Sequence, residues 1–143
     1  MTTKSKLQAR LADTSKSGVF RAPTDQAVLD AMAGADFDFV PIRIGKGKDA
    51  ILASVASALG FPDWFGGNWD ALEDSLTDLS WRDDKPRVFL FSDASTGDDL
   101  GILIDVLSSA AEYWKERDRA FFAVFVDPRD KLVLPPLYKE KAG

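Results

Sequence analysis

The stretch FPDWFGGNWDALEDSLTDLSW, residues 61–81, carries the strongest structural signal of this 143-residue chain. The pair Gly66-Gly67 disfavours a helix through that point and is typical of a tight turn. Asn68 follows and belongs to the residues preferred at a helix N-cap, so a helix is expected to begin after it. Apolar side chains then recur at the spacing of one helical face: Trp69, Leu72, Leu76 and Leu79. The stretch therefore predicts a turn followed by a helix that buries one face.

A row of aspartates runs along a second face of this predicted helix. Asp70, Asp74 and Asp78 follow one another at intervals of four residues, about 100° around the helix from the apolar stripe. Such a charge run is usually a solvated face. Like charges at this spacing nevertheless destabilise a helix by about 0.2–0.5 kcal/mol per pair, and no lysine is interleaved with them. Two interpretations stay open: a solvated face, and a surface shaped for a cationic partner.

The acidic residues of the chain are unevenly distributed. The chain has 18 Lys and Arg residues against 23 Asp and Glu residues, a net charge of −5. Seven acidic residues and one arginine lie between Asp63 and Asp84, a net of −6, so the remainder carries +1. A chain with this balance is not expected to bind nucleic acid directly, because phosphate binding needs a basic face. The imbalance marks residues 63–84 as a distinct acidic surface.

Two residue types are missing, because the chain contains neither histidine nor cysteine. Disulfides, thiolate nucleophiles and zinc fingers are thereby excluded, as are the usual general base near neutral pH and the commonest metal ligand. We therefore expect no cofactor, no metal and no enzymatic activity. One enzymatic alternative uses Asp70 and Asp74 as an acid–base pair or as magnesium ligands. It is the weakest hypothesis, because exposed carboxylates on adjacent helical turns lack the desolvation that acid–base catalysis needs.

Apolar segments alternate with helical ones along the rest of the chain. Strands are expected at residues 37–44, 87–91 and 120–126, and further helices at 51–59 and 100–117. This alternation predicts an α/β fold, with a small three-stranded parallel sheet covered by helices. The segment GKGK at 45–48 faintly resembles a phosphate loop, but it lacks the Walker spacing and is interpreted as a turn.

The two ends of the chain are less regular. Residues 1–18 are interpreted as a loosely held arm with a short helix near 7–11, and a capped helix follows Thr24 and ends at Gly34. The proline-rich residues 128–143 either pack as an extended strap or fray. Neither a signal peptide nor a membrane span is recognisable, so the cytoplasm is the expected location.

Residues 61–81 closely resemble the signature of the barstar family, small intracellular inhibitors of secreted microbial ribonucleases. The shared positions are Pro62, Asp63, Trp64, Phe65, Gly66, Asn68, Asp70, Ala71, Leu72, Asp74, Leu76, Thr77 and a following tryptophan. The order of the flanking strands and helices agrees as well. The resemblance implies a barstar-like domain at 36–127, a partly helical N-terminal extension at 1–35 and a proline-rich tail at 128–143.

The resemblance also implies a binding site, because in this family the second helix and the preceding loop enter the ribonuclease active site. Trp64 matches the loop aromatic that covers the catalytic centre, and Asp74 matches the carboxylate that takes the place of an RNA phosphate. The other implied partner-binding residues are Asn68, Asp70 and Glu73 on the helix, Thr77 and Trp81 at the far rim, and Glu112 and Glu116 on a later helix. Leu79 is an alternative to Trp81. The implied partner is a basic ribonuclease of the secreted type, bound one to one, without direct nucleic-acid or membrane binding.

Three positions depart from the family pattern. Glu73 stands where the family prototype has a tryptophan, Ser75 where it has a cysteine, and Gly67 where it has an acidic residue. The lost helix aromatic motivates a second hypothesis. In that alternative, the chain is a non-inhibitory interaction or regulatory module of the same fold, which binds another cationic protein surface.

Overall fold

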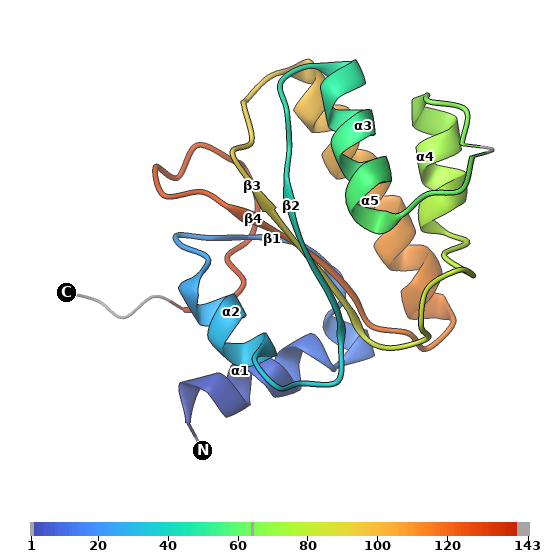
Figure 1. Ribbon diagram of the computed structural model, residues 1–143. Helices are drawn as coiled ribbons and strands as arrows, with labels where there is room; N and C mark the ends of the chain where they lie inside the picture. The colour runs from blue at the N-terminus through green and yellow to red at the C-terminus, as the bar shows by residue number, and fades with distance from the viewer. Residues whose placement is uncertain (1, 64, 140–143) are drawn as a thin grey trace.

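A parallel β-sheet lies between two layers of helices in the computed structural model, which describes residues 2–63 and 65–139 (Figure 1). The elements in chain order are α1 (Thr3–Leu11), the 3-10 turn η1 (Thr14–Lys16), β1 (Gly18–Ala22), α2 (Gln26–Met32), β2 (Asp38–Arg43), α3 (Lys48–Leu59), α4 (Trp69–Leu76), β3 (Arg87–Ser92), α5 (Asp98–Glu116) and β4 (Phe121–Val126). None of the helices in these two ranges is long and apolar enough to cross a membrane.

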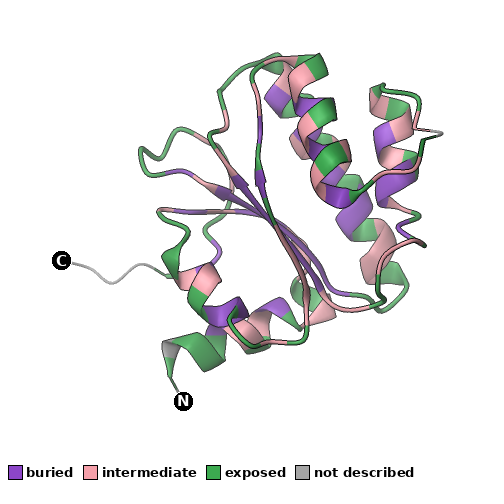
Figure 2. Ribbon diagram, viewed as in Figure 1, coloured by how far each residue is buried: buried purple, intermediate pink, exposed green. Residues whose placement is uncertain are grey.

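The sheet has the strand order β1-β4-β3-β2, and all neighbouring strands are parallel. The central strands β3 and β4 are buried on both faces up to their last residue (Figure 2). Their sequences, RVFLFS and FFAVFV, are almost continuous apolar runs, as strands covered on both sides require. The predicted α/β class and parallel pairing are confirmed, whereas the predicted number of three strands is wrong.

The additional strand, β1, comes from the segment that was expected to precede the domain. It pairs with β4 from Gly18 opposite Phe122 to Ala22 opposite Val126. The sequence signal was weak because β1 is short and Arg21 interrupts its apolar residues. Residues 1–35 therefore contribute an edge strand to the same sheet, and the proposed division at residue 36 remains a prediction about the family domain.

The proline-rich segment after β4 lies along the outer edge of β1. The backbone N–H of Arg21 donates to Pro135 O at 2.9 Å, and the N–H of Leu137 donates to Arg21 O at 2.9 Å. The guanidinium Nε of Arg21 also donates to Leu134 O at 3.0 Å. This segment is the predicted strap rather than a frayed tail as far as residue 139, and it covers backbone groups that an edge strand would otherwise expose.

Helices α3, α4 and α5 lie on one face of the sheet, and α1 and α2 lie on the other (Figure 1). The first core gathers apolar residues of α3 and α5 around Phe89, Phe91 and Phe125. The second joins residues of α1 and α2 to Phe20 and Phe122. Helix α4 packs mainly against α5 rather than against a strand. It is therefore an outer helix, on which Asp70 and Asp74 are exposed to solvent.

The predicted end of α3 at Gly60 is confirmed, whereas the predicted cap of α2 is displaced by one residue. Gly60 closes α3 in the left-handed conformation with φ of 64°, and its N–H donates to Ala56 O and Ser57 O. At the start of α2 the N-cap is Asp25 rather than Thr24, and its side chain makes no capping hydrogen bond.

Candidate partner-binding surface

Aromatic contacts hold the loop that leads into α4. The ring of Phe61 meets those of Phe65 and Trp81 edge to face, with centroid distances of 4.9 and 5.8 Å. The N–H of Phe65 donates to Pro62 O at 3.0 Å. Two aromatic side chains therefore anchor the loop to the core. The predicted contact residue Trp64 lies outside the described residues.

Asn68 caps α4 as predicted. Its Oδ1 accepts a hydrogen bond from the backbone N–H of Ala71 at 2.7 Å. Asp70 follows in the first turn, where the positive end of the helix dipole stabilises a carboxylate. The Asn68 oxygen therefore serves the helix, and its side-chain NH₂ donates no hydrogen bond within the described ranges.

Helix α4 has a buried face and an acidic face. Leu72, Ser75 and Leu76 are buried. Asp70 and Asp74 are exposed and Glu73 is half-buried. Within residues 2–63 and 65–139, none of these three carboxylates forms an ion pair. The three form one negative surface, which we call the α4 acidic face.

The helix ends earlier than predicted, which removes Asp78 from the aspartate row. Leu76 is the last helical residue, and Leu79 adopts φ of 51°. The N–H groups of Asp78 and Leu79 both donate to Ser75 O, at 3.2 and 3.1 Å, so the final turn is tightened. Leu79 is only 1% exposed, because this turn directs it into the core. Asp78 consequently lies at the end of the acidic face, not along it.

The two residues predicted at the far rim both donate side-chain hydrogen bonds to backbone carbonyls. The hydroxyl of Thr77 donates to Glu73 O at 2.9 Å, and the indole Nε1–H of Trp81 donates to Leu59 O at 3.0 Å. Both side chains stay partly exposed, whereas the alternative rim residue, Leu79, is buried. Between Leu79 and Trp81, only Trp81 retains surface for a partner.

Two of the seven acidic residues between 63 and 84 are neutralised within the fold. Asp84 accepts a hydrogen bond from Arg119 Nε at 2.8 Å, which lowers the pKa of this aspartate. Asp83 lies 3.9 Å from the Nζ of Lys85. The remaining five form no ion pair within the described ranges: Asp63, Asp70, Glu73, Asp74 and Asp78. Unpaired negative charge is thus concentrated on α4 and at its two ends.

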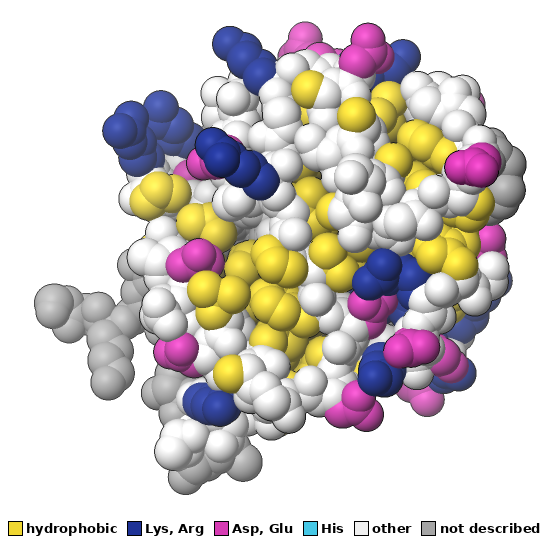
Figure 3. All heavy atoms as spheres, in the orientation of Figure 1, with side chains coloured by type: hydrophobic (Ala, Val, Ile, Leu, Met, Phe, Trp, Pro, Cys, Tyr) yellow, Lys and Arg dark blue, Asp and Glu magenta, His cyan; other side chains and the backbone are white. Residues whose placement is uncertain are grey.

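Arg82 fixes the segment that follows α4. Its Nε and Nη2 donate to the two oxygens of Asp38 at 2.9 and 2.7 Å, and its Nη1 donates to Leu59 O at 3.0 Å. The hydrogen bond with Asp38 raises the pKa of Arg82. Figure 3 shows positive and negative side chains intermixed around this segment. Nothing in the sequence signals the pair, because its members are 44 residues apart.

Helix α5 supports α4 but does not turn its predicted glutamates toward it. The indole of Trp114 donates to Leu76 O at 2.8 Å and joins the two helices. Glu112 and Glu116 are exposed, and at 100° per residue both lie about 160° around α5 from Trp114. The structure therefore does not bring these two residues together with the α4 acidic face.

Two residues at the end of α5 were missed as candidates: Tyr113 in its last turn and Arg117, its C-cap. The guanidinium of Arg117 stacks 3.6 Å above the ring centroid of Tyr113, and its Nη1 donates to Tyr113 O at 3.0 Å. Arg117 shares a hollow with Asp78 and Trp114 at the end of α4. The spacing of four residues between Tyr113 and Arg117 was the available signal, since such pairs meet on one helix face.

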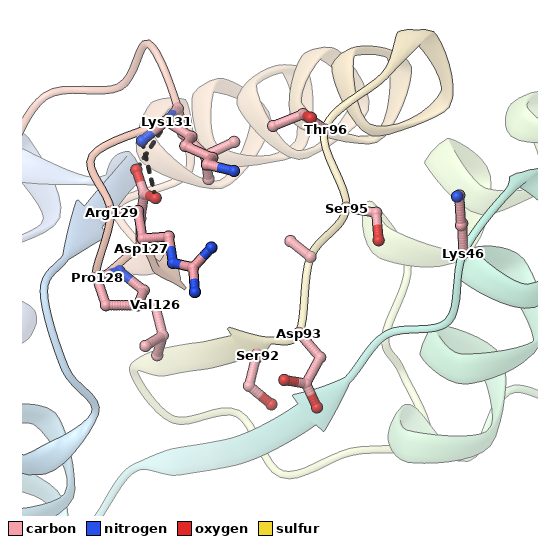
Figure 4. A pocket seen from close by; sticks show the side chains of 12 residues that line it. Lys46, Ser92, Asp93, Ser95, Thr96, Val126, Asp127, Pro128, Arg129 and Lys131 are labelled. Atoms are coloured by element: carbon pink, nitrogen blue, oxygen red, sulfur yellow. Dashed lines mark hydrogen bonds between the residues drawn. The ribbon is translucent and has the colours of Figure 1, made fainter.

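A hollow of about 600 Å³ lies beyond the carboxyl ends of β3 and β4, where ligands often bind in open α/β sheets (Figure 4). Its two carboxylates are used in contacts within the protein. Asp93 pairs with Arg43 at 2.6 Å, and Asp127 accepts the N–H groups of Lys131 and Leu132 at 3.0 and 2.8 Å. In the part of the chain that the structure describes, no group of three or more potential acidic, histidine or cysteine ligands gathers around a metal position. Asp70 and Asp74, on which the carboxylate enzyme hypothesis rests, do not line this hollow.

Comparison with protein-family models matches residues 42–126 to the family described as Barstar (barnase inhibitor). The match covers more than half of the chain and includes the loop, the α4 acidic face and α5, whereas α1, β1 and α2 lie outside it. A search of curated proteins finds no match. The chain belongs to the barstar (barnase inhibitor) family.

Proposed function

We propose that this chain is an inhibitor that blocks the active site of a basic ribonuclease with α4 and the loop before it. The observation that carries the proposal is the α4 acidic face on a chain of the barstar family. Ribonucleases hold RNA phosphates with cationic side chains, and carboxylates form strong charge-assisted hydrogen bonds with the same groups. The inhibitor would act by occlusion and would perform no chemistry of its own.

Hydrogen bonds hold both ends of α4 before any partner binds. The Asn68 cap holds the start of α4, and the Trp114 bond to Leu76 holds its end. A surface that is already ordered loses less conformational entropy on association, so more of its interaction free energy appears as affinity. The ordered ends of α4 therefore support binding of this helix to a partner without a change in its conformation.

The predicted contact residues take different parts in the proposal. Asp74 and Asp70 meet cationic side chains of the nuclease directly, and Glu73 lies beside them. The flanking contacts come from Trp64, Asn68, Thr77 and Trp81. Glu112 and Glu116, which point away from α4, contribute long-range attraction rather than contact. We propose a one-to-one complex and place it in the cytoplasm of the cell that makes the nuclease.

A second candidate function keeps the fold and the acidic face but not inhibition. It is favoured by Glu73, a charged residue where the family pattern has an aromatic one, since aromatic anchors commonly contribute to tight interfaces. In this alternative the chain binds a cationic surface of a different protein. Affinity capture from native lysate at low salt separates the two candidates, because recovery of a ribonuclease supports inhibition and excludes the alternative.

Charge-matched variants test the proposal on purified proteins. Association and dissociation rates with a panel of small basic ribonucleases are measured for the wild type, Asp74→Asn and Asp105→Asn. Asp105 is an exposed residue of α5 and provides the same change of charge away from the α4 acidic face. We expect Asp74→Asn to weaken binding by about 2–5 kcal/mol, mostly through dissociation, and Asp105→Asn to change only the salt-dependent association rate slightly. Equal effects of both variants would contradict a specific α4 interface.

A further inference from the structure

A hollow of about 380 Å³ lies beyond the end of α4, where the following segment meets the end of α5. Its charged lining is mostly positive: Arg82, Arg87, Arg117 and Arg119 against Asp78 and Asp84, with Trp114 as an aromatic wall. With Asp38, which pairs with two of these arginines, four guanidinium groups meet three carboxylates. The hollow thus has a positive excess in a chain whose net charge is −5.

Two of the four arginines are matched by carboxylates. Arg82 donates two hydrogen bonds to Asp38, and Arg119 donates one to Asp84. These two pairs need no further anion. Arg87 and Arg117 therefore remain without a hydrogen-bonded carboxylate in the described ranges, although Arg87 Nε lies 3.9 Å from Asp38.

Arg87 is a buried guanidinium with few hydrogen bonds. It is 5% exposed, and its charged carbon lies 5.3 Å from the ring centroid of Trp114. Within the described ranges it donates only from Nη1, to Asp83 O at 3.4 Å and Lys85 O at 3.5 Å, while its Nε has no hydrogen-bond acceptor and lies 3.9 Å from Asp38. Burial lowers the pKa of this arginine. A guanidinium has five N–H donors, so Arg87 can still bind an acceptor that enters the hollow.

Arg117 is the more accessible of the two. Its stacking on Tyr113 fixes the plane of the guanidinium, and one of its N–H groups is used by Tyr113 O. No carboxylate in residues 2–63 or 65–139 forms an ion pair with it, including Asp78, which lines the same hollow. The remaining donors of Arg117 are fixed in place without an anionic partner.

We propose that this hollow receives an acidic side chain of the protein that docks on the α4 acidic face, bound by Arg117 and Arg87. The hollow adjoins that face, because Asp78 borders it and Trp114 bonds to the last residue of α4. A partner seated on α4 would cover the hollow and exclude water, which strengthens a carboxylate–guanidinium contact. The inference rests on the proposed function for the partner, which accordingly carries a carboxylate beside its cationic surface.

The anion preference of the hollow is measurable on the free chain. Acetate, as the carboxylate probe, and inorganic phosphate are titrated while NMR follows the indole N–H of Trp114 and the Nε–H of Arg87. We expect saturable shifts with acetate. Arg117→Gln should weaken the affinity for acetate about tenfold, because it removes a charge-assisted hydrogen bond. Arg129→Gln, an exposed cation in the loop after β4, leaves this affinity unchanged (Figure 4). Absence of saturation, equal effects of both variants or a preference for phosphate over acetate would overturn the proposal.

Charge reversal tests the same site in the complex. The proposal predicts weaker binding of the partner, whereas the change in net charge alone predicts tighter binding. Arg117→Glu and Arg129→Glu each make the chain more negative by two charges, which alone should favour a basic partner. We expect Arg129→Glu to bind as tightly as the wild type or slightly faster, and Arg117→Glu to bind at least about tenfold more weakly. Equal or tighter binding of Arg117→Glu would overturn the proposal. If no ribonuclease binds even the wild type, the proposed function fails, and the acetate titration still decides whether the hollow binds a carboxylate.

Discussion

The indole Nε1–H of Trp114 donates a 2.8 Å hydrogen bond to the backbone carbonyl of Leu76, the last residue of α4. The final carbonyls of a helix lack partners within the helix, so a side chain from outside can satisfy one of them. Here the donor comes from α5, which packs on the sheet. One hydrogen bond therefore links the position of the α4 acidic face to the core of the molecule.

Replacing Trp114 by phenylalanine removes this bond and keeps an aromatic ring in the same place. We expect the free energy of unfolding to fall by about 1–3 kcal/mol, because the Leu76 carbonyl loses its donor and some packing is lost. Tyr113→Phe is the matched control in the same helix, with an expected change within about 0.5 kcal/mol. Urea denaturation of both variants makes the comparison, and equal stabilities would show that the bond contributes nothing.

Replacement of Ser75 is expected to raise the free energy of unfolding rather than lower it. Ser75 is fully buried in α4, and its hydroxyl has no hydrogen-bond partner among the described residues. We expect Ser75→Ala to raise the free energy of unfolding by about 1 kcal/mol, because an unsatisfied polar group is removed and alanine favours the helix.

Ser57→Ala separates these two contributions. Ser57 is an exposed position of α3, so its replacement gains helix propensity alone. A smaller gain for Ser57→Ala than for Ser75→Ala would show that the buried hydroxyl of Ser75 costs stability. A loss of stability on Ser75→Ala would mean that the hydroxyl is satisfied.

The sequence predicted the parts of the fold that rest on local pattern. The buried strands β3 and β4 are unbroken apolar runs, and Gly60 ends α3 through its left-handed conformation. The strand β1 was missed because its stability comes from pairing with β4 and from the strap, both more than 100 residues away in sequence. Long-range pairing of this kind leaves no periodic signal in a five-residue segment.

The candidate surface was predictable to a similar extent. The cap Asn68 and the exposed Asp70 and Asp74 followed from spacing and preference. The position of Asp78 did not, because a periodic pattern does not reveal that Leu79 turns into the core with positive φ. The placement of α5 beneath α4 depends on tertiary packing, so the orientation of its glutamates could not be read from sequence alone.

Asp38 forms ion pairs with both Arg82 and Arg87. Its carboxylate is 8% exposed, accepts two hydrogen bonds from Arg82 and lies 3.9 Å from Arg87 Nε. We expect Asp38→Asn to lower the free energy of unfolding by about 3–5 kcal/mol, because buried positive charge loses its partner.

The control for this variant is Asp36→Asn. Asp36 is exposed and pairs with Lys85 at the surface, so its removal should change stability by less than about 1 kcal/mol. Thermal or urea denaturation measures both. Comparable losses for the two variants would contradict a special role for Asp38.

The ion pair between Asp84 and Arg119 predicts a pH dependence of stability. The hydrogen bond from Arg119 lowers the pKa of Asp84 in the folded state below its ordinary value of 3.8. A carboxylate with a lowered pKa stabilises the fold fully above its unfolded pKa, and this contribution is lost as the pH falls through the folded pKa.

Arg119→Gln removes the cause of this shift. The variant should therefore lose stability less steeply than the wild type below about pH 3.8, while the two curves run parallel at higher pH. Urea midpoints across the acidic range measure the difference. Parallel curves down to the lowest pH would show that the pair does not influence stability.

Inhibition through the α4 acidic face is tested most directly by a stoichiometric titration of RNA hydrolysis by small basic ribonucleases, including any made by the same cell. With the target nuclease, we expect activity to fall linearly to zero at one equivalent of this chain, and Asp74→Asn to abolish this sharp end point at the same concentrations. Added salt should weaken inhibition. Unchanged hydrolysis across the whole panel, or tight binding that leaves hydrolysis intact, would contradict inhibition through the α4 acidic face.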